Sequence, residues 1–218
     1  MTAGGPDIRP SRDIPVVDLT AGDVAEIARV HVLAQPDSEL GRYGPEVVRR
    51  SYLWQFEGPH DLTAIGVRRD GELQGFLIGG VFRGSTTGFV KREWRFLVGQ
   101  VLRHPSALLH PGARSRMVLA GRLLLGRGAP SAPDPASAVD RSFGVLAIAV
   151  DPAARGQGLG RAIMDAAEQT ARAEGYDQMH LTVEPANGHA LAFYERGGWQ
   201  PWTPEGEPWT GFMVKPLR

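Results

Sequence analysis

The chain has 218 residues, of which 42% are hydrophobic and 22% are charged, and its formal net charge is zero. This composition is typical of a globular protein and argues against a disordered or fibrous one. The chain contains no cysteine, which excludes disulfides, thiolate metal sites and a covalent thioester intermediate on the protein.

The first third of the chain predicts a tail, two helices and a hairpin. Residues 1–12 indicate a flexible tail that lacks the hydrophobic segment of a signal peptide, and residues 13–218 form one domain. No apolar run approaches the ~18 residues of a membrane span, so we expect a cytoplasmic protein. Elements are then expected in this order: a strand at 14–18, a helix that starts from a Thr20–Asp23 capping box, a helix from Pro45, and two antiparallel strands joined by Asp70-Gly71.

Residues 84–140 read as an insertion of two helical pieces followed by the linker "GAPSAPDPASA". Within it, residues 91–127 hold eight Lys or Arg and a single acid, Glu93. Three roles remain open: a lid or a homodimer surface, an amphipathic element on a membrane surface, and a patch that binds a nucleic acid. We favour the lid or dimer surface, because the segment is rich in Leu, Val and Phe.

The last third alternates strands and helices. The apolar run "SFGVLAIAV" predicts a buried strand over 142–150, and a glycine-rich loop leads from it into a helix over 159–173. A strand over 179–183, a helix over 188–196 and a hairpin from 199–202 and 209–214 complete the expected elements. The loop between strand and helix is the chemically informative part.

This loop, within "VDPAARGQGLGRAIMDAAEQ" (150–169), has the features of an anion-binding site. Unpaired N–H groups and the helix dipole meet there, glycines permit close approach, and Arg155 and Arg161 add positive charge. The sequence has no Walker loop, and the spacing G-x-G-x-G differs from the dinucleotide fingerprint. A glycine-rich turn that binds nothing is the alternative.

Two segments resemble the Gcn5-related N-acetyltransferase (GNAT) superfamily. "AVDPAARGQGLGRAIM" is similar to its motif A through Arg155, Gly158 and Gly160. "LTVEPANGHALAFYERGGW" is similar to its motif B, with Asn187, Ala190, Phe193 and Tyr194. The resemblance implies an α/β (α+β) fold with a mixed, mostly antiparallel sheet of about six or seven strands flanked by helices. The basic helical insertion 84–140 would then lie between strands three and four.

The resemblance also implies acetyl-coenzyme A as the acyl donor and assigns residues to it. The diphosphate would rest on the loop amides, the pantetheine arm would pair with the preceding strand, and residues of motif B would hold the arm from the other side. The coenzyme-binding residues implied are Ile148, Ala149, Val150, Arg155, Gly156, Gln157, Gly158, Leu159, Gly160, Arg161, Asn187 and Phe193. We expect no metal, because His180 and His189 lack metal-ligand spacing.

Acetyl transfer to an amine requires a polarised thioester carbonyl and a proton for the departing thiolate. The resemblance assigns these roles to the N–H of Val150 and to Tyr194. Glu184 is nearby and is a candidate base, although its position favours a solvated strand end. Three other sources of a base stay open: His31, Asp37 or Glu39, and a chain of water molecules.

The acceptor is expected between residues 35–44 and the final hairpin. Acidic side chains there (Asp37, Glu39, Glu205 and Glu207) suit a cationic amine, such as an amino sugar, a polyamine-like or an antibiotic-like amine. The sequence therefore predicts an N-acetyltransferase that acts by direct transfer in a ternary complex. The alternative is a non-catalytic module that uses residues 91–127 to engage a nucleic acid or an anionic membrane.

Overall fold

The computed structural model describes residues 14–36, 38, 40–41, 44–83, 85–103 and 141–217. Its centre is a seven-stranded sheet with the order β1-β2-β3-β4-β5-β7-β6. The strands are β1 (Val17–Asp18), β2 (Asp61–Arg69), β3 (Glu72–Val81), β4 (Ser142–Val150), β5 (Gln178–Thr182), β6 (Gln200–Pro201) and β7 (Phe212–Pro216). Only the β4–β5 pair is parallel. The mixed, mostly antiparallel sheet is therefore confirmed.

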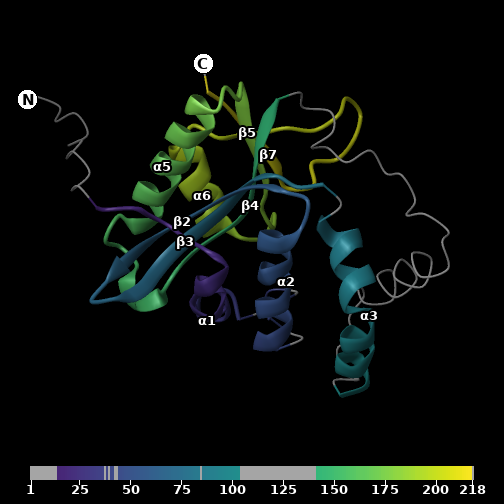
Figure 1. The fold of residues 1–218 in the computed structure, drawn as a ribbon. Coiled ribbons are helices and arrows are strands. Elements are labelled where there is room, and N and C mark those ends of the chain that lie inside the picture. Colours follow the sequence, from purple (N-terminus) through teal and green to yellow (C-terminus); the bar gives the residue numbers. More distant parts are fainter. Residues whose placement is uncertain are drawn as a thin grey trace, which may run out of the picture.

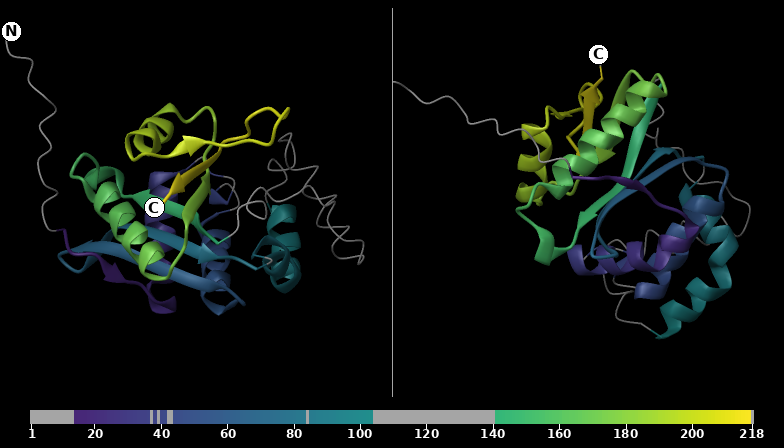
Figure 2. Two further views of the ribbon diagram at one scale, coloured as in Figure 1. Left: turned by 90° about the horizontal axis from the view of Figure 1, so that it is seen from above. Right: turned by 60° about the vertical axis from the view of Figure 1, so that its left-hand side comes forward.

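Helices cover both faces of this sheet. They are α1 (Val24–Ala34), α2 (Pro45–Glu57), α3 (Ser85–Arg103), α5 (Leu159–Ala173) and α6 (Gly188–Arg196), with 3-10 turns η1 (Ala21–Asp23) and η5 (Pro152–Ala154). Figures 1 and 2 show α1 and α2 on one face and α5 and α6 on the other. Each face has its own apolar cluster, one built around α1 and α2 and the other around α5. None of the described helices is both long and apolar enough to cross a membrane.

Local sequence signals account for the first elements. Thr20 and Asp23 form the expected capping box, in which the Asp23 carboxylate accepts from the Thr20 N–H at 2.7 Å. Pro45 stands in the first turn of α2, where its missing N–H costs no hydrogen bond. In the hairpin turn, Asp70 and Gly71 both have positive φ (50° and 82°), as a two-residue turn between twisted strands requires.

The predicted bounds of β4, α5 and α6 agree with the structure residue for residue. Strands at the sheet edges are shorter than predicted: β1 spans Val17–Asp18 instead of 14–18, and β6 ends at Pro201. Trp202, the last residue of the predicted strand, still donates its N–H to the Phe212 carbonyl of β7 at 3.0 Å.

The predicted insertion begins with α3, which follows β3 directly and lies beside α2 (Figure 1). Gly88 makes this docking close, because a Cβ added there would lie 2.3 Å from the Trp54 ring. The Arg50 guanidinium sits 4.1 Å above the Phe96 ring. Three further predictions lie outside the described residues: the tail 1–12, the second helical piece with its basic residues, and the linker.

Candidate functional site

Strand β4 has a free edge over its second half. It pairs with β5 only over Ser142–Val145, whereas its pairing with β3 continues to Val150. Among the described residues, the backbone from residue 147 onward therefore has no neighbouring strand on the β5 side. Such an edge offers unpaired N–H and C=O groups to an extended ligand.

A β-bulge at Leu146 decides which groups reach this edge. Val145 pairs with Gly79 and Ala147 pairs with Ile78, so that Leu146 has no partner and is 44% exposed. One extra residue reverses the alternation of faces. Consequently Ile148 and Val150 pack toward the α5 cluster, and Ala147 and Ala149 toward the α1–α2 cluster.

The same reversal turns backbone groups of Ile148 and Val150 toward the free edge. The N–H of Asp151 donates to the Gln74 carbonyl of β3 at 2.8 Å, so the residues that alternate with it face the other way. In agreement, the Ile148 carbonyl accepts from the Gln35 side chain at 3.3 Å, beyond the end of α1. The N–H of Val150 belongs to this outward-facing set.

The glycine-rich loop follows immediately. Gly156 and Gly158 have φ of 74° and 81°, which residues with a Cβ rarely adopt, and Gly158 is the N-cap of α5. Within the described part of the chain, no group accepts from the N–H of Gly156, Gln157 or Gly158. The first N–H groups of α5 have no intrahelical partner either. These donors, together with the helix dipole, form a cradle for an anion.

Four arginines reach the loop. Arg29 pairs with Asp151 at 3.2 Å, and Arg161 pairs with Asp165 at 2.8 Å. Arg155 instead donates to the carbonyl of Ala34 at 3.0 Å. Arg69, at the end of β2, donates to the side-chain oxygen of Gln157. Arg155 and Arg161 were predicted from the loop sequence, whereas no motif indicated Arg29 or Arg69.

Beyond the loop, α5 and α6 approach the free edge closely. A Cβ added at Gly160 would lie 3.6 Å from Val150 and 3.8 Å from the Phe193 ring. Asn187 is the N-cap of α6, and its side-chain oxygen accepts from the Ala190 N–H at 3.1 Å. Phe193 thus adjoins the strand edge, and the side chain of Asn187 fixes the start of α6.

Tyr194 lies deeper in the same region. It is 9% exposed and packs against the rings of Phe193 and Trp199, with centroids 5.3 and 5.9 Å away. Burial raises its pKa to about 12, so the phenol stays protonated at physiological pH. Its hydroxyl makes no hydrogen bond to the described residues. A protonated, unpartnered hydroxyl is suited to give a proton to a bound molecule.

The candidate bases differ in their surroundings. Glu184 lies two residues after the end of β5 and is exposed. His31 is 5% exposed, and its two ring nitrogens lie 2.7 Å from the Tyr52 hydroxyl and 2.9 Å from Ser38 Oγ. Both nitrogens of His31 are therefore engaged inside the α1–α2 packing. Asp37 and Glu39, the remaining candidates, lie outside the described residues.

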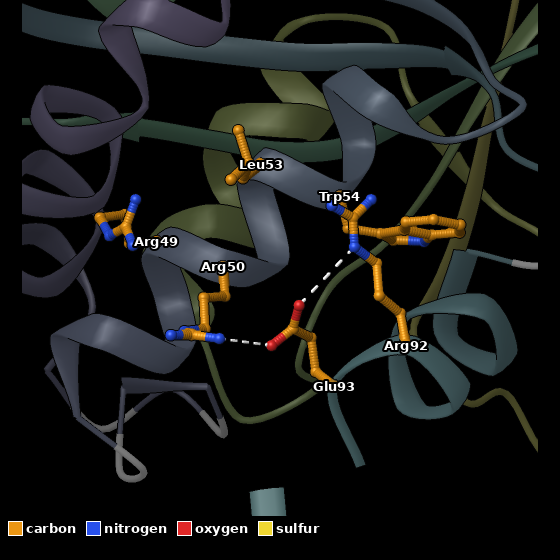
Figure 3. Close-up of a pocket in the computed structure, with 6 residues that line it drawn as sticks. All are labelled: Arg49, Arg50, Leu53, Trp54, Arg92 and Glu93. Carbon is orange, nitrogen blue, oxygen red and sulfur yellow. Dashed lines mark hydrogen bonds and ion pairs between the residues drawn. The ribbon is translucent and has the colours of Figure 1, made fainter. Parts of the chain in front are cut away.

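A separate pocket of about 260 Å³ lies between α2 and α3 (Figure 3). It is lined by Arg49, Arg50, Leu53, Trp54, Arg92 and Glu93. Each of its arginines is paired with a glutamate: Arg49 with Glu46, Arg50 with Glu93, and Arg92 with Glu57. The two charges of each pair compensate one another, so the pocket is not an anion-binding site. It is part of the contact between α2 and α3. Among the described residues, no cluster of His, Asp and Glu could hold a metal ion.

The family comparison bears directly on the loop and on motif B. Residues 127–199 match the model of the "Acetyltransferase (GNAT) family", and this range includes the second half of β4, the glycine-rich loop, Asn187 and Tyr194. This third of the chain carries the sequence signature of the GNAT superfamily.

Curated GNAT relatives share a short stretch with this chain. A mycothiol acetyltransferase of Beutenbergia cavernae is 46% identical over 57 residues, which is 26% of this chain and 19% of the relative. A mycothiol acetyltransferase of Jonesia denitrificans is 43% identical over 61 residues, or 28% and 19%. The chain thus matches about a fifth of the length of these relatives.

Solved structures agree with the GNAT fold over nearly the whole chain. The ribosomal-protein-S18-alanine N-acetyltransferase of Escherichia coli superposes with a TM-score of 0.54 at 16% identity, covering 93% of both chains. The PaiA N-acetyltransferase of Thermoplasma acidophilum, solved in complex with coenzyme A, gives 0.55 at 12% identity, covering 94% and 99%. At this identity the likeness establishes the fold alone.

The GNAT motifs could not indicate the residues that approach the site from other elements. Gln35 follows α1 and contacts Ile148, and Arg69 ends β2 and contacts Gln157. Neither residue belongs to a motif, and their partners lie 113 and 88 positions away in the sequence. The tertiary fold alone brings Gln35 to β4 and Arg69 to the loop.

Proposed function

We propose that the protein transfers an acetyl group from acetyl-coenzyme A to the primary amine of a small molecule. The observation that carries this proposal is the free edge of β4, which runs into a loop of unpaired N–H groups at the start of α5. A diphosphate and a chain of amides are the ligand groups that these two features match. The match of residues 127–199 to the GNAT family supports the same donor.

The residues present fit this donor. The loop from Arg155 to Arg161 would hold the diphosphate through main-chain N–H groups, and the outward-facing groups of Ile148 and Val150 would bond the pantetheine amides. Phe193 would pack against the arm, because its ring lies next to the bare backbone of Gly160. When bound, the coenzyme supplies the activated acetyl group as a thioester.

Direct transfer of the acetyl group needs no covalent enzyme intermediate. The absence of cysteine from the chain favours this route. The amine nitrogen forms a bond to the carbonyl carbon, the carbon–sulfur bond breaks, and the thiolate takes a proton. The N–H of Val150 would stabilise the developing negative charge on oxygen, and Tyr194 would supply the proton. Glu184, directly or through water, would accept the proton that the amine loses.

For the acceptor, an amino sugar, a polyamine-like or an antibiotic-like amine fits best. Glu205 and Glu207 are exposed in the loop before β7 and favour a cation. The curated relatives are named mycothiol acetyltransferases, and their similarity covers about a quarter of this chain. Compounds of the mycothiol type therefore belong in any acceptor panel.

The test is calorimetric titration with acetyl-coenzyme A, followed by an amine panel that monitors release of free coenzyme A. We expect binding in the micromolar range and turnover with at least one amine. Absence of heat at millimolar donor would refute the proposed donor site. Donor binding without turnover on any amine would refute the enzymatic function.

A second candidate function rests on α3. Trp94 and Val98, four residues apart on this helix, are 42% and 48% exposed, and the neighbouring Lys91 and Arg95 are also exposed. Exposed apolar and basic side chains on one helix suit the surface of an anionic membrane. Sedimentation with anionic and neutral vesicles tests this. Binding to the anionic vesicles that Trp94→Ser weakens would support it, and equal recovery with both would exclude it.

A further inference from the structure

Arg69 is, beside Arg29, one of two arginines near the loop that neither motif includes. It is the last residue of β2, directly before the Asp70-Gly71 turn, and it is exposed. Its guanidinium donates to the side-chain oxygen of Gln157, at the middle of the glycine-rich loop. The hairpin thereby carries a positive charge to the loop from a distant part of the chain.

The charge of Arg69 differs in one respect from that of its neighbours. Arg29 and Arg161 each face a carboxylate, so their charges are compensated within the protein. Arg155 and Arg69 donate to neutral oxygens, a carbonyl and an amide. A neutral acceptor orients a guanidinium without neutralising it.

The acids closest to Arg69 in sequence do not change this balance. Asp70 and Glu72 are both exposed, and neither lies within ion-pair distance of Arg69 in the described structure. Arg68, the preceding residue, is by contrast bound by Asp23 and Glu26. Arg68 therefore holds the hairpin to the start of α1, whereas the uncompensated charge of Arg69 lies at the loop.

We propose that Arg69 binds a phosphate group of coenzyme A, with Gln157 as the residue that positions it. This inference rests on the proposed function, because it assigns a further residue to the same donor. Coenzyme A carries a diphosphate and a 3′-phosphate, and main-chain N–H groups contribute only partial charges. The guanidinium of Arg69 adds a full positive charge beside these partial charges.

The experiment is calorimetric titration of the full chain with coenzyme A and with dephospho-coenzyme A, which lacks the 3′-phosphate, at several salt concentrations. We expect Arg69→Gln to weaken coenzyme A binding about fivefold at low salt, since the contact is exposed and screened. It should also make binding less dependent on salt. A weakening confined to coenzyme A assigns Arg69 to the 3′-phosphate; an equal weakening with both ligands assigns it to the diphosphate.

Two further variants separate a charge effect from a structural one. Arg196→Gln removes the same charge from the exposed end of α6 and should leave affinity unchanged. Gln157→Ala keeps the charge but removes its support, so it should weaken binding about twofold and preserve the salt dependence of the wild type.

The outcomes also distinguish failure of the role of Arg69 from failure of the proposed acetyltransferase function. Wild-type protein that fails to bind coenzyme A refutes both. Wild-type protein that binds, together with an Arg69→Gln variant of equal affinity or unchanged salt dependence, refutes the role of Arg69 and leaves the proposed function intact. A melting curve for each variant confirms that it is folded.

Discussion

Burial suits the hydroxyl of Tyr194 to its proposed role, which is to give a proton to the departing thiolate. The phenol lies among Phe193 and Trp199, and burial raises its pKa to about 12. It therefore holds its proton throughout the range in which an amine can lose one. A stronger acid at this place would already have lost its proton when the thiolate departs.

Tyr194→Phe removes the proposed proton donor and keeps the ring. We expect kcat to fall about 100-fold, a typical contribution of a positioned acid, with little change in the affinity for coenzyme A. Steady-state kinetics and titration calorimetry measure the two effects. Tyr176→Phe is the matched control, because Tyr176 also packs against an aromatic ring, that of Phe143, on a different part of the sheet. Equal rates for wild type and Tyr194→Phe would remove Tyr194 from the mechanism.

His31 gives the stability of the fold a dependence on pH. Burial lowers its pKa below the ordinary 6.5, so the folded protein keeps it neutral at a pH where the unfolded chain takes up a proton. Its contribution is therefore present above pH 6.5 and is lost as pH falls. Burial and the nearby Arg83 lower the pKa of His60, which adds a loss of the same sign.

Urea unfolding at pH 7.5 and pH 5.5 tests this. The wild type should be less stable at the lower pH, and His31→Gln should lose less stability between the two. Carboxylates contribute little in this window, because the ordinary pKa values of Asp23 and Glu26 are 3.8 and 4.5 and folding lowers both. The interpretation fails if the variant and the wild type show the same pH dependence. His60→Gln separates the second contribution.

At the scale of elements, the sequence predicted those parts whose signals are local. The bounds of β4, α5 and α6 follow from a dense apolar run, from glycines at the loop and from Asn187 as a cap. The bulge at Leu146 left no such signal, because every residue around it is apolar or glycine. It arises from the registers that β3 and β5 impose on β4.

The packing of α3 on α2 likewise depends on contacts between separate segments. Glu93 on α3 reaches Arg50 on α2 at 2.7 Å and also lies 3.7 Å from Arg92 (Figure 3). Its side chain is 16% exposed, so the contact is partly shielded from solvent. In the sequence, Glu93 stands out only as the single acid of the basic segment 91–127. In the structure it joins the two helices.

Glu93→Ala should therefore loosen α3 from α2. We expect a loss of about 1 kcal/mol in the free energy of unfolding, the upper end for an ion pair of this exposure. Limited proteolysis should also cleave within 85–103 faster. Glu57→Ala is the control, because Glu57 pairs with Arg92 at a side-chain exposure of 40% and should cost less. Equal effects of the two substitutions would contradict the assignment.

For the whole molecule, β4, like β2 and β3, contributes side chains to both faces of the sheet. Val145 belongs to the cluster under α5, and Ala149 to the cluster under α1 and α2. Residues from both faces reach the free edge of β4 and the loop after it: Gln35 after α1 contacts Ile148, and Phe193 of α6 lies next to Gly160. Binding at this place should thus stabilise the whole fold, since a ligand bound only by the native state shifts the unfolding equilibrium.

A matched pair of glycines tests whether coenzyme A stabilises the fold by binding at the loop. Gly158 and Gly206 have almost the same φ, 81° and 82°, and are both exposed, but only Gly158 belongs to the loop. Replacing either by alanine should cost about 1 kcal/mol of stability, because a Cβ strains this backbone conformation. Coenzyme A at a hundred times its dissociation constant should add about 2.7 kcal/mol to the wild type. Gly206→Ala should retain this gain in a thermal melt, whereas Gly158→Ala should lose most of it, because the distorted loop no longer aligns its N–H groups. An undiminished gain in Gly158→Ala would show that the coenzyme binds elsewhere.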